Sequence, residues 1–189
     1  MPPPTTFPSF GPPRIPENCH KDRRVGCLMG NEFFVGYSFL SVAQGGSERE
    51  SLPIGAHVSF TKSLTRRVGL VADISYHTKK KDDVTITRSY MTAGLQYDII
   101  EKEEERRMKV LAHLLAGLAN DKYVYSFGDD KEKIKQDAFL IAFGLGWGLP
   151  VNRKIMIGII ADYLIAKFAE EWLGDVRVSA GVRINLNCK

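Results

Sequence analysis

Six titratable side chains share the polar face of segments in which polar and apolar residues alternate. They are His57, Asp73, His113, Asp162, Arg177 and Arg183. Aspartate beside histidine is the combination that general acid–base catalysis or proton transfer uses. Neither chemistry is favoured, because no nucleophile lies in a recognisable catalytic motif. We interpret the six residues as a lumen charge network whose members neutralise one another in a narrow interior, since an unpaired buried charge is costly.

Two other stretches contain residue types that bind phosphate or perform catalysis at a rim. GLGWG at residues 144–148 has the glycines of a phosphate-binding loop but not the strand, turn and helix that such a loop joins. His77, Asp82 and Asp83 lie beside three lysines in a polar stretch, which we interpret as a solvated loop tip. No His or Cys spacing is typical of a metal site. The sequence therefore predicts no enzyme, no catalytic residue, no cofactor and no metal.

The stretch at residues 153–186 indicates how these side chains are positioned. From Asp175 onward the odd positions are polar or small and the even positions are apolar, which is the period of a β-strand. The preceding half alternates in the same way. Folding the two halves onto each other about residues 169–170 sets Asp162 opposite Arg177. The sequence predicts a hairpin with one apolar side and one side that carries a charge pair.

The rest of the chain repeats this pattern in six earlier segments, which start near residues 33, 54, 68, 90, 110 and 138. The segment at residues 110–119, VLAHLLAGLA, also fits a helix. The predicted strands have about ten to thirteen residues, and the longer connections are expected at residues 43–52, 78–87, 120–135 and 165–174. Eight consecutive antiparallel strands close into a barrel. The predicted fold is all-β, an eight-stranded antiparallel up-and-down β-barrel.

The composition of the two faces predicts which face points outward. The polar face has a glycine or another small residue in every strand, which suits a narrow interior and would weaken strands that face water. The apolar face ends in aromatic residues, as the interfacial belt of a transmembrane barrel does. These predicted interfacial aromatics are Tyr76, Tyr97, Trp147 and Tyr163. A transmembrane barrel is favoured, and the alternative is a soluble lipocalin-like barrel that binds a small apolar ligand.

Residues 1–31 form a separate Pro-rich segment before the predicted barrel at residues 32–189. Seven of the nine prolines lie in residues 1–16, which favours an extended, solvated tail. No export signal is visible in the sequence as printed. We expect Cys19, Cys27 and Cys188 to be free thiols, with a Cys19–Cys27 disulfide as the alternative in an oxidising compartment.

Charge and hydropathy exclude two other classes of protein. The net charge is only +4 and the basic residues are scattered, which argues against nucleic acid as a partner. No stretch reaches the roughly 18 apolar residues of a membrane-spanning helix, so a helical membrane protein is excluded.

Six segments resemble one known family. In order along residues 33–186 they are GYSFL, GLVADISYH, HLLAGLA, FGLGWGL, IMIGIIADYLIAKF and DVRVSAGVRINL. They are similar to small outer-membrane β-barrel proteins known mainly from soil bacteria, which have an OmpA-type eight-stranded barrel. The resemblance implies the bacterial outer membrane as location and the lipid bilayer as partner. It implies a structural, anchoring or surface-interaction role, with at most a narrow pore and with long loops that contact an extracellular ligand or surface partner.

Overall fold

The structure is a computed structural model of the chain, and it describes residues 30–186 except 45–47, 82, 102–107, 128–129, 153 and 169–170. Residues 1–29 of the Pro-rich segment predicted at residues 1–31, the charge run at residues 102–107 and the three cysteines lie outside the described residues. The described residues contain no helix that is long and apolar enough to cross a membrane.

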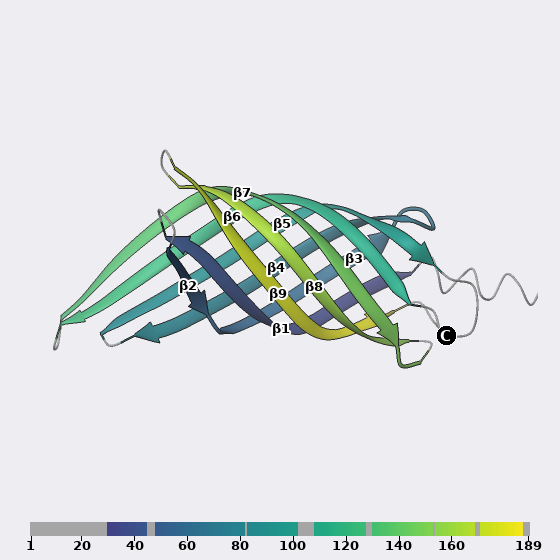
Figure 1. The fold of residues 1–189 in the computed structure, drawn as a ribbon, viewed down its shortest axis with the longest axis horizontal. Coiled ribbons are helices and arrows are strands. Elements are labelled where there is room, and N and C mark those ends of the chain that lie inside the picture. The colour runs from purple at the N-terminus through teal and green to yellow at the C-terminus, as the bar shows by residue number, and fades with distance from the viewer. Residues whose placement is uncertain are drawn as a thin grey trace, which may run out of the picture.

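In the described part of the chain, nine strands form one antiparallel sheet that closes on itself (Figure 1). They are β1 (Asn31–Gln44), β2 (Glu48–Leu52), β3 (Ile54–Ser63), β4 (Val68–Lys81), β5 (Val84–Glu101), β6 (Lys109–Phe127), β7 (Asp130–Pro150), β8 (Ile155–Phe168) and β9 (Glu171–Asn185). Each strand pairs with the next along the wall, and β1 pairs with β9 to close the barrel. The predicted up-and-down barrel is confirmed.

Two of these strands, β2 and β3, together occupy one strand position in the barrel wall. β2 and β3 both pair with β1, β2 along its second half and β3 along its first half. Pro53 separates them, and proline interrupts a strand because it has no backbone N–H to donate to the ladder. The barrel wall therefore has eight strand positions, as the sequence predicts. The segment at residues 110–119 is part of β6, so the helical alternative is wrong.

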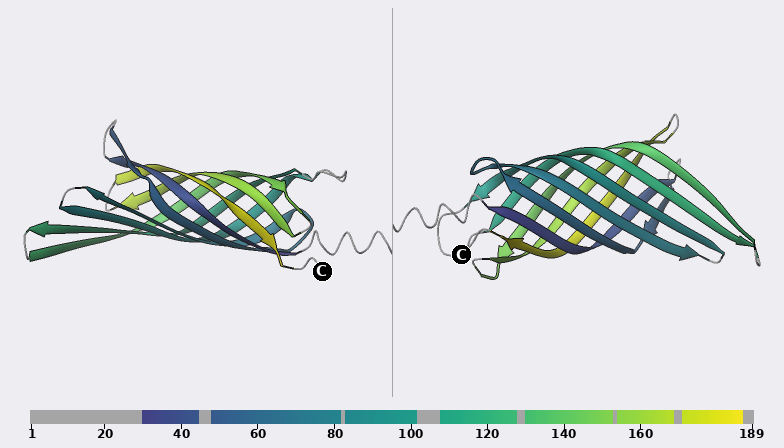
Figure 2. Two further views of the ribbon diagram at one scale, coloured as in Figure 1. Left: turned by 90° about the horizontal axis from the view of Figure 1, so that it is seen from below. Right: turned by 180° about the vertical axis from the view of Figure 1, so that it is seen from behind.

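The prediction of long loops is wrong, because these stretches are largely β-strand. Most of the described residues within 43–52, 78–87, 120–135 and 165–174 lie in strands. Two residues separate β4 from β5, β6 from β7 and β8 from β9. The strands reach 14 to 21 residues in β4 to β7. Period-two alternation could not reveal these extensions, because both faces of a strand that leaves the wall meet water. The β6–β7 hairpin runs well past the mouth of the barrel on one side (Figure 2).

The apolar face of the wall points outward and the polar face points inward, as predicted. Along β4, the even-numbered residues from Leu70 to Tyr76 are exposed and the odd-numbered residues from Gly69 to His77 are buried. The soluble alternative with an apolar interior is wrong, because buried charged side chains fill the inner face.

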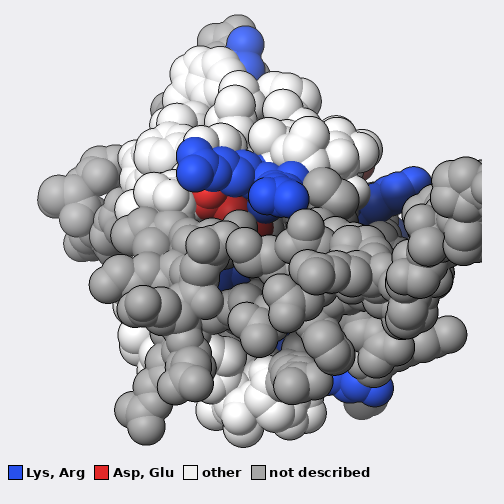
Figure 3. All heavy atoms as spheres, turned by 90° about the vertical axis from the view of Figure 1, so that its right-hand side faces the viewer, with Lys and Arg blue, Asp and Glu red and all other residues white. Residues whose placement is uncertain are grey.

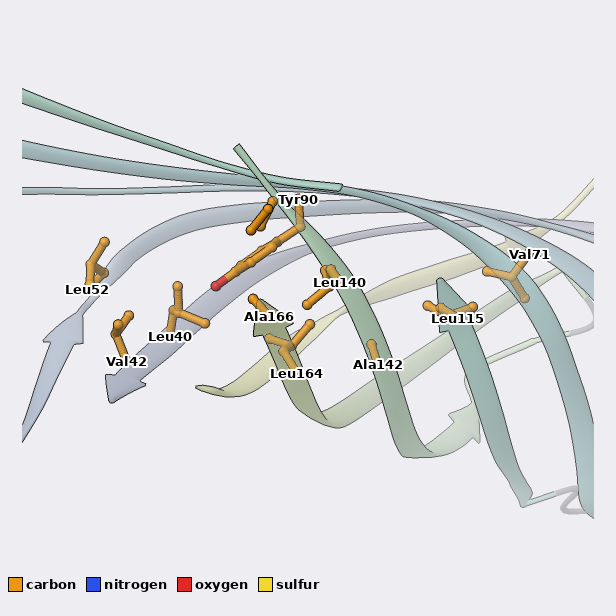
Figure 4. Close-up of a cluster of buried hydrophobic side chains, with 12 residues drawn as sticks. Leu40, Val42, Leu52, Val71, Tyr90, Leu115, Leu140, Ala142, Leu164 and Ala166 are labelled. Carbon is orange, nitrogen blue, oxygen red and sulfur yellow. The ribbon is translucent and has the colours of Figure 1, made fainter. Parts of the chain in front are cut away.

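The interior also contains an apolar cluster that the sequence did not predict (Figure 4). Its larger members are Leu40, Val42, Leu52, Val71, Tyr90, Leu115, Leu140 and Leu164. These side chains project inward from seven of the strands and fill much of the space between the polar groups. The inner face is therefore amphipathic, and it packs like a small core.

Candidate functional site

The centre of the barrel interior is built on one fully buried arginine. The guanidinium of Arg177 donates to Asp162 at 2.7 Å and to Asp73 at 2.9 Å, and it also donates to the Ser75 hydroxyl at 2.7 Å. Asp162 is the register partner of Arg177 across β8 and β9, whereas Asp73 reaches it from β4 on another part of the wall. One arginine thus neutralises two carboxylates, and it ties distant strands together.

Two histidines extend this central cluster. His57 is hydrogen-bonded to Asp73, and His113 Nε2 lies 2.6 Å from Asp162 Oδ1. The His57 ring packs edge-on against Phe34, and its Nδ1 atom has no hydrogen-bond partner among the described residues. Five of the six predicted network residues are therefore brought together in one place.

Gly144 makes room for the contact between His113 and Asp162. It lies between these residues in the sheet, as the register partner of His113 on β6 and of Asp162 on β8. A Cβ atom at this position would overlap the Asp162 carboxylate and the His113 ring. The glycine of GLGWG therefore has a packing role, in agreement with our interpretation that it is not a phosphate loop.

Arg183, the sixth predicted residue, belongs to a separate ion-pair group near the end of the barrel. It lies 2.8 Å from Glu32, which is also 2.8 Å from Lys109. Lys109 in turn lies 3.0 Å from Asp98. Glu32, Asp98 and Lys109 were not predicted, because the sequence places them where strands begin or end and the alternation is weakest.

A third charged group was missed entirely. Arg88 bonds to Asp121, its register partner on β6, and to Asp175 at 2.6 Å, and the Tyr90 hydroxyl donates to Asp175 at 2.8 Å. All four side chains are buried. The sequence contains a signal for this group, because Arg88 and Asp121 continue the alternating inward positions of β5 and β6. Both lie in stretches that we had interpreted as loops or loop ends.

One arrangement near the centre has the residue types of a hydrolase. His77 Nε2 lies 2.9 Å from Ser38 Oγ, which is 2.8 Å from Ser179 Oγ. All three side chains are fully buried, so a substrate cannot reach the hydroxyl groups. The three side chains are better explained as a group that hydrogen-bonds buried hydroxyl groups, while His77 Nδ1 has no partner among the described residues. The structure thus places His77 inside the barrel, not at the loop tip that the sequence predicted.

Metal binding finds no support within the described residues, where no group of three His, Cys, Asp or Glu side chains could hold an ion.

The four predicted interfacial aromatics lie on the outer wall and are 36% to 50% exposed. Tyr97 and Trp147 are in the half nearer the chain termini, where their register partners include Val68 and Val110. Tyr76 and Tyr163 are in the other half, and the Tyr163 ring packs against Phe143. That these four aromatics mark the two membrane interfaces stays a prediction.

Comparisons with known proteins identify the fold. No family model matches the chain, and no curated protein matches it. Among solved structures, the chain is similar to Ail, the attachment invasion locus protein of Yersinia pestis, with 19% identity and a TM-score of 0.62 over 82% of this chain and 99% of that one. It is also similar to Neisserial surface protein A, with 14% identity and a TM-score of 0.62 over 83% of this chain and 97% of that one.

A third similar structure is the N-terminal β-barrel domain of Pseudomonas aeruginosa OprF, with 13% identity and a TM-score of 0.50 over 82% of this chain and 98% of that domain. Identities this low show a shared fold. The chain has the fold of the small eight-stranded outer-membrane β-barrels.

Proposed function

We propose that the protein spans the bacterial outer membrane as an anchor that presents β-hairpins outside the cell. The observation that carries this proposal is the outer wall, where large apolar side chains are exposed around the whole barrel. Met91 is 63% exposed and Leu114 is 61% exposed. Others are Val35, Phe39, Leu70, Ile74, Leu95, Leu118, Phe143, Leu145, Ile157, Ile159, Val178 and Val182. A soluble monomer rarely exposes so large an apolar surface, and lipid is its natural solvent.

The proposed orientation follows from the strand lengths. Transmembrane barrels have short turns at the periplasmic end and longer extensions outside the cell. The two described ends of the chain meet at one end, where the Leu186 N–H donates to the Asn31 carbonyl at 2.9 Å. Figure 3 looks onto this end, where Lys and Arg side chains are visible beside a small group of acidic atoms. This end would face the periplasm, and the extended hairpins of β4 to β7 would face the exterior.

The packed interior supports a structural role and not transport or catalysis. Arg177 is 0% exposed, and the other inward charged side chains at the centre are buried as well. A wide aqueous channel would leave such groups accessible. The surface-interaction part of the proposal is assigned to the extended hairpins, because they carry polar side chains beyond the apolar wall.

We expect the protein to need detergent or lipid to stay in solution and to show heat-modifiable migration on gels when folded. The reason is that the exposed apolar wall has no other favourable solvent. Circular dichroism and gel migration of unheated and heated samples would measure this, with urea-unfolded protein as the control. A monodisperse monomer in detergent-free buffer that is rich in strand would contradict the proposed function.

We also expect at most a small conductance in planar bilayers. Eight strands enclose a space that side chains nearly fill, and here the ion-paired cluster around Arg177 and the apolar cluster occupy it together. Single-channel recordings of the refolded protein would test this, with a sixteen-stranded porin as the positive control. A large and steady porin-sized conductance would show that the interior opens in the membrane.

A further inference from the structure

We infer that the central cluster around Arg177 is a pH-sensitive device, in which a proton held on the His113 ring stabilises the folded barrel. The cluster consists of five buried side chains, which are His57, Asp73, His113, Asp162 and Arg177. The inference concerns the interior of the barrel, and it goes beyond the proposed anchoring role. It predicts that the barrel loses stability as the pH rises above neutral.

The carboxylates and the guanidinium of the cluster do not reach full charge balance by themselves. Asp73 and Asp162 carry two negative charges, and Arg177 carries one positive charge. The guanidinium is shared by both carboxylates, at 2.9 Å from Asp73 and 2.7 Å from Asp162. A net charge inside a packed interior is costly. One bound proton would complete the balance, and histidine is the side chain that takes up a proton near neutral pH.

Two histidines contact these carboxylates, and their hydrogen bonds distinguish them. His57 Nε2 is bonded to Asp73, whereas the buried His57 Nδ1 has no partner among the described residues. A protonated imidazole has an N–H group on both ring nitrogens, so a charged His57 would bury one donor without an acceptor. Such a donor is destabilising. We therefore expect His57 to stay neutral, with its Nε2–H donated to Asp73.

His113 is better placed to hold the proton. Its Nε2 lies 2.6 Å from Asp162 Oδ1, and Gly144 leaves the space for this contact. Among the described side chains, the buried nitrogen atoms without a partner belong to His57 and His77, and neither belongs to His113. A charged His113 can therefore donate to Asp162 without burying an unsatisfied N–H group on its other side.

The groups that face His113 along its row of the sheet come from four strands. Its register partners are Gln96 on β5 and Gly144 on β7, and the same row continues to Asp162 on β8 and Arg177 on β9. Gln96 is uncharged and donates to Asp98. Within this row, the carboxylate of Asp162 favours a charged imidazole and the guanidinium of Arg177 opposes it.

The remaining charged neighbours come from other parts of the wall. Asp73 on β4 shares Arg177 with Asp162, and His57 on β3 is bonded to Asp73. The ion-pair group near the end of the barrel has two acidic and two basic members, which are Glu32, Asp98, Lys109 and Arg183. This second group balances its own charges. The excess negative charge therefore lies in the central cluster, and it favours a proton on His113.

Release of the proton should destabilise the barrel. In the unfolded chain a histidine is neutral above about pH 6.5, so a folded state with a charged His113 binds one proton more than the unfolded state. Stability then decreases as the pH rises, and the equilibrium constant for folding falls about tenfold for each unit of pH. Once His113 is neutral, only Arg177 compensates the two carboxylates.

The test is urea unfolding of the full-length protein in lipid vesicles between about pH 7 and about pH 8. Across this unit, the native protein should lose about tenfold in the folding equilibrium constant relative to His113→Gln. The matched control is His57→Gln, which should keep the pH dependence of the native protein because its ring holds no extra proton. Asp162→Asn should abolish the pH dependence, because Arg177 then balances Asp73 without a proton.

The ¹⁵N NMR spectrum of the histidine rings gives a second readout on the native protein in detergent micelles. The two ring nitrogens have similar chemical shifts in a charged imidazole and well-separated shifts in a neutral one. At about pH 7 we expect the charged pattern for His113 and the neutral pattern for His57. A neutral His113, or the same pH dependence in His113→Gln as in the native protein, would overturn the inference. Heat-modifiable migration of each sample reports separately on the proposed membrane fold.

Discussion

Arg177→Ala is expected to lower the free energy of unfolding by about 3 to 5 kcal/mol, the usual cost of breaking a buried ion pair. Arg177 is fully buried and contacts two carboxylates, those of Asp73 and Asp162. Removing it leaves both carboxylates inside the barrel without a guanidinium, beside His57, His113 and the Thr92 hydroxyl. The expected loss is therefore at the upper end of that range. Urea unfolding in lipid vesicles would measure it.

The same experiment has an internal rescue. Combining Arg177→Ala with Asp73→Asn and Asp162→Asn removes all three charges, and it should recover much of the lost stability because no uncompensated charge remains. Asp162→Asn alone should rescue Arg177→Ala less well, since Asp73 stays charged. Arg66→Ala in an exposed turn is the control and should change stability by less than about 0.5 kcal/mol. A harmless Arg177→Ala would contradict the role of the central cluster.

Val178→Arg is expected to cost about 2 to 4 kcal/mol in the same vesicle assay, because it would place a charge on the lipid-facing wall near the midplane. Val178 follows Arg177 by one residue and is 40% exposed on the outer face. Its register partners, Phe39 on β1 and Ala161 on β8, also lie on the outer wall. No change inside the barrel should restore stability, so Asp73→Asn and Asp162→Asn should give no rescue.

The cost of an outward arginine should depend on depth, which provides the control. Leu186→Arg places the same charge at the end of the wall, beyond the last residue of β9, and it should cost only about 0 to 1 kcal/mol. If Val178→Arg and Leu186→Arg proved equally harmless, the outer wall would not be in contact with lipid. Together with Arg177→Ala, these variants test both faces of one strand.

The alternation of residues predicts most of the fold, because burial on one side of a strand constrains every second residue. This holds best where lipid lies on one side and packed side chains on the other, as along β9, where Asp162 meets Arg177 as the sequence predicts. The number of strand positions in the barrel wall and the face that points outward both follow from the same pattern. The break between β2 and β3 at Pro53 also has a cause in the sequence, because proline is excluded from the interior of a β-sheet hydrogen-bond ladder.

The extended hairpins and much of the interior could not be predicted in this way. Beyond the lipid both faces of a strand are solvated, so Lys122 and Lys135 give no alternation to detect. The charged group of Arg88, Asp121 and Asp175 is buried, and it was missed because Arg88 and Asp121 lie in or beside stretches that we interpreted as loops. The separation of Arg183 from the central cluster depends on position along the barrel axis. The alternation of polar and apolar residues predicts on which face of the sheet a residue lies. It does not predict which residues of non-adjacent strands contact each other.

The most direct test of the central claim uses the fluorescence of Trp147, which is exposed on the outer wall. The chain has two tryptophans, so Trp172→Phe leaves Trp147 as the single reporter. Folded in vesicles of brominated phosphatidylcholine, this variant should be strongly quenched relative to unbrominated vesicles, and aqueous iodide should quench it little. Strong quenching by iodide with no effect of brominated lipid would show that the apolar wall faces water, and the membrane-spanning account would be wrong.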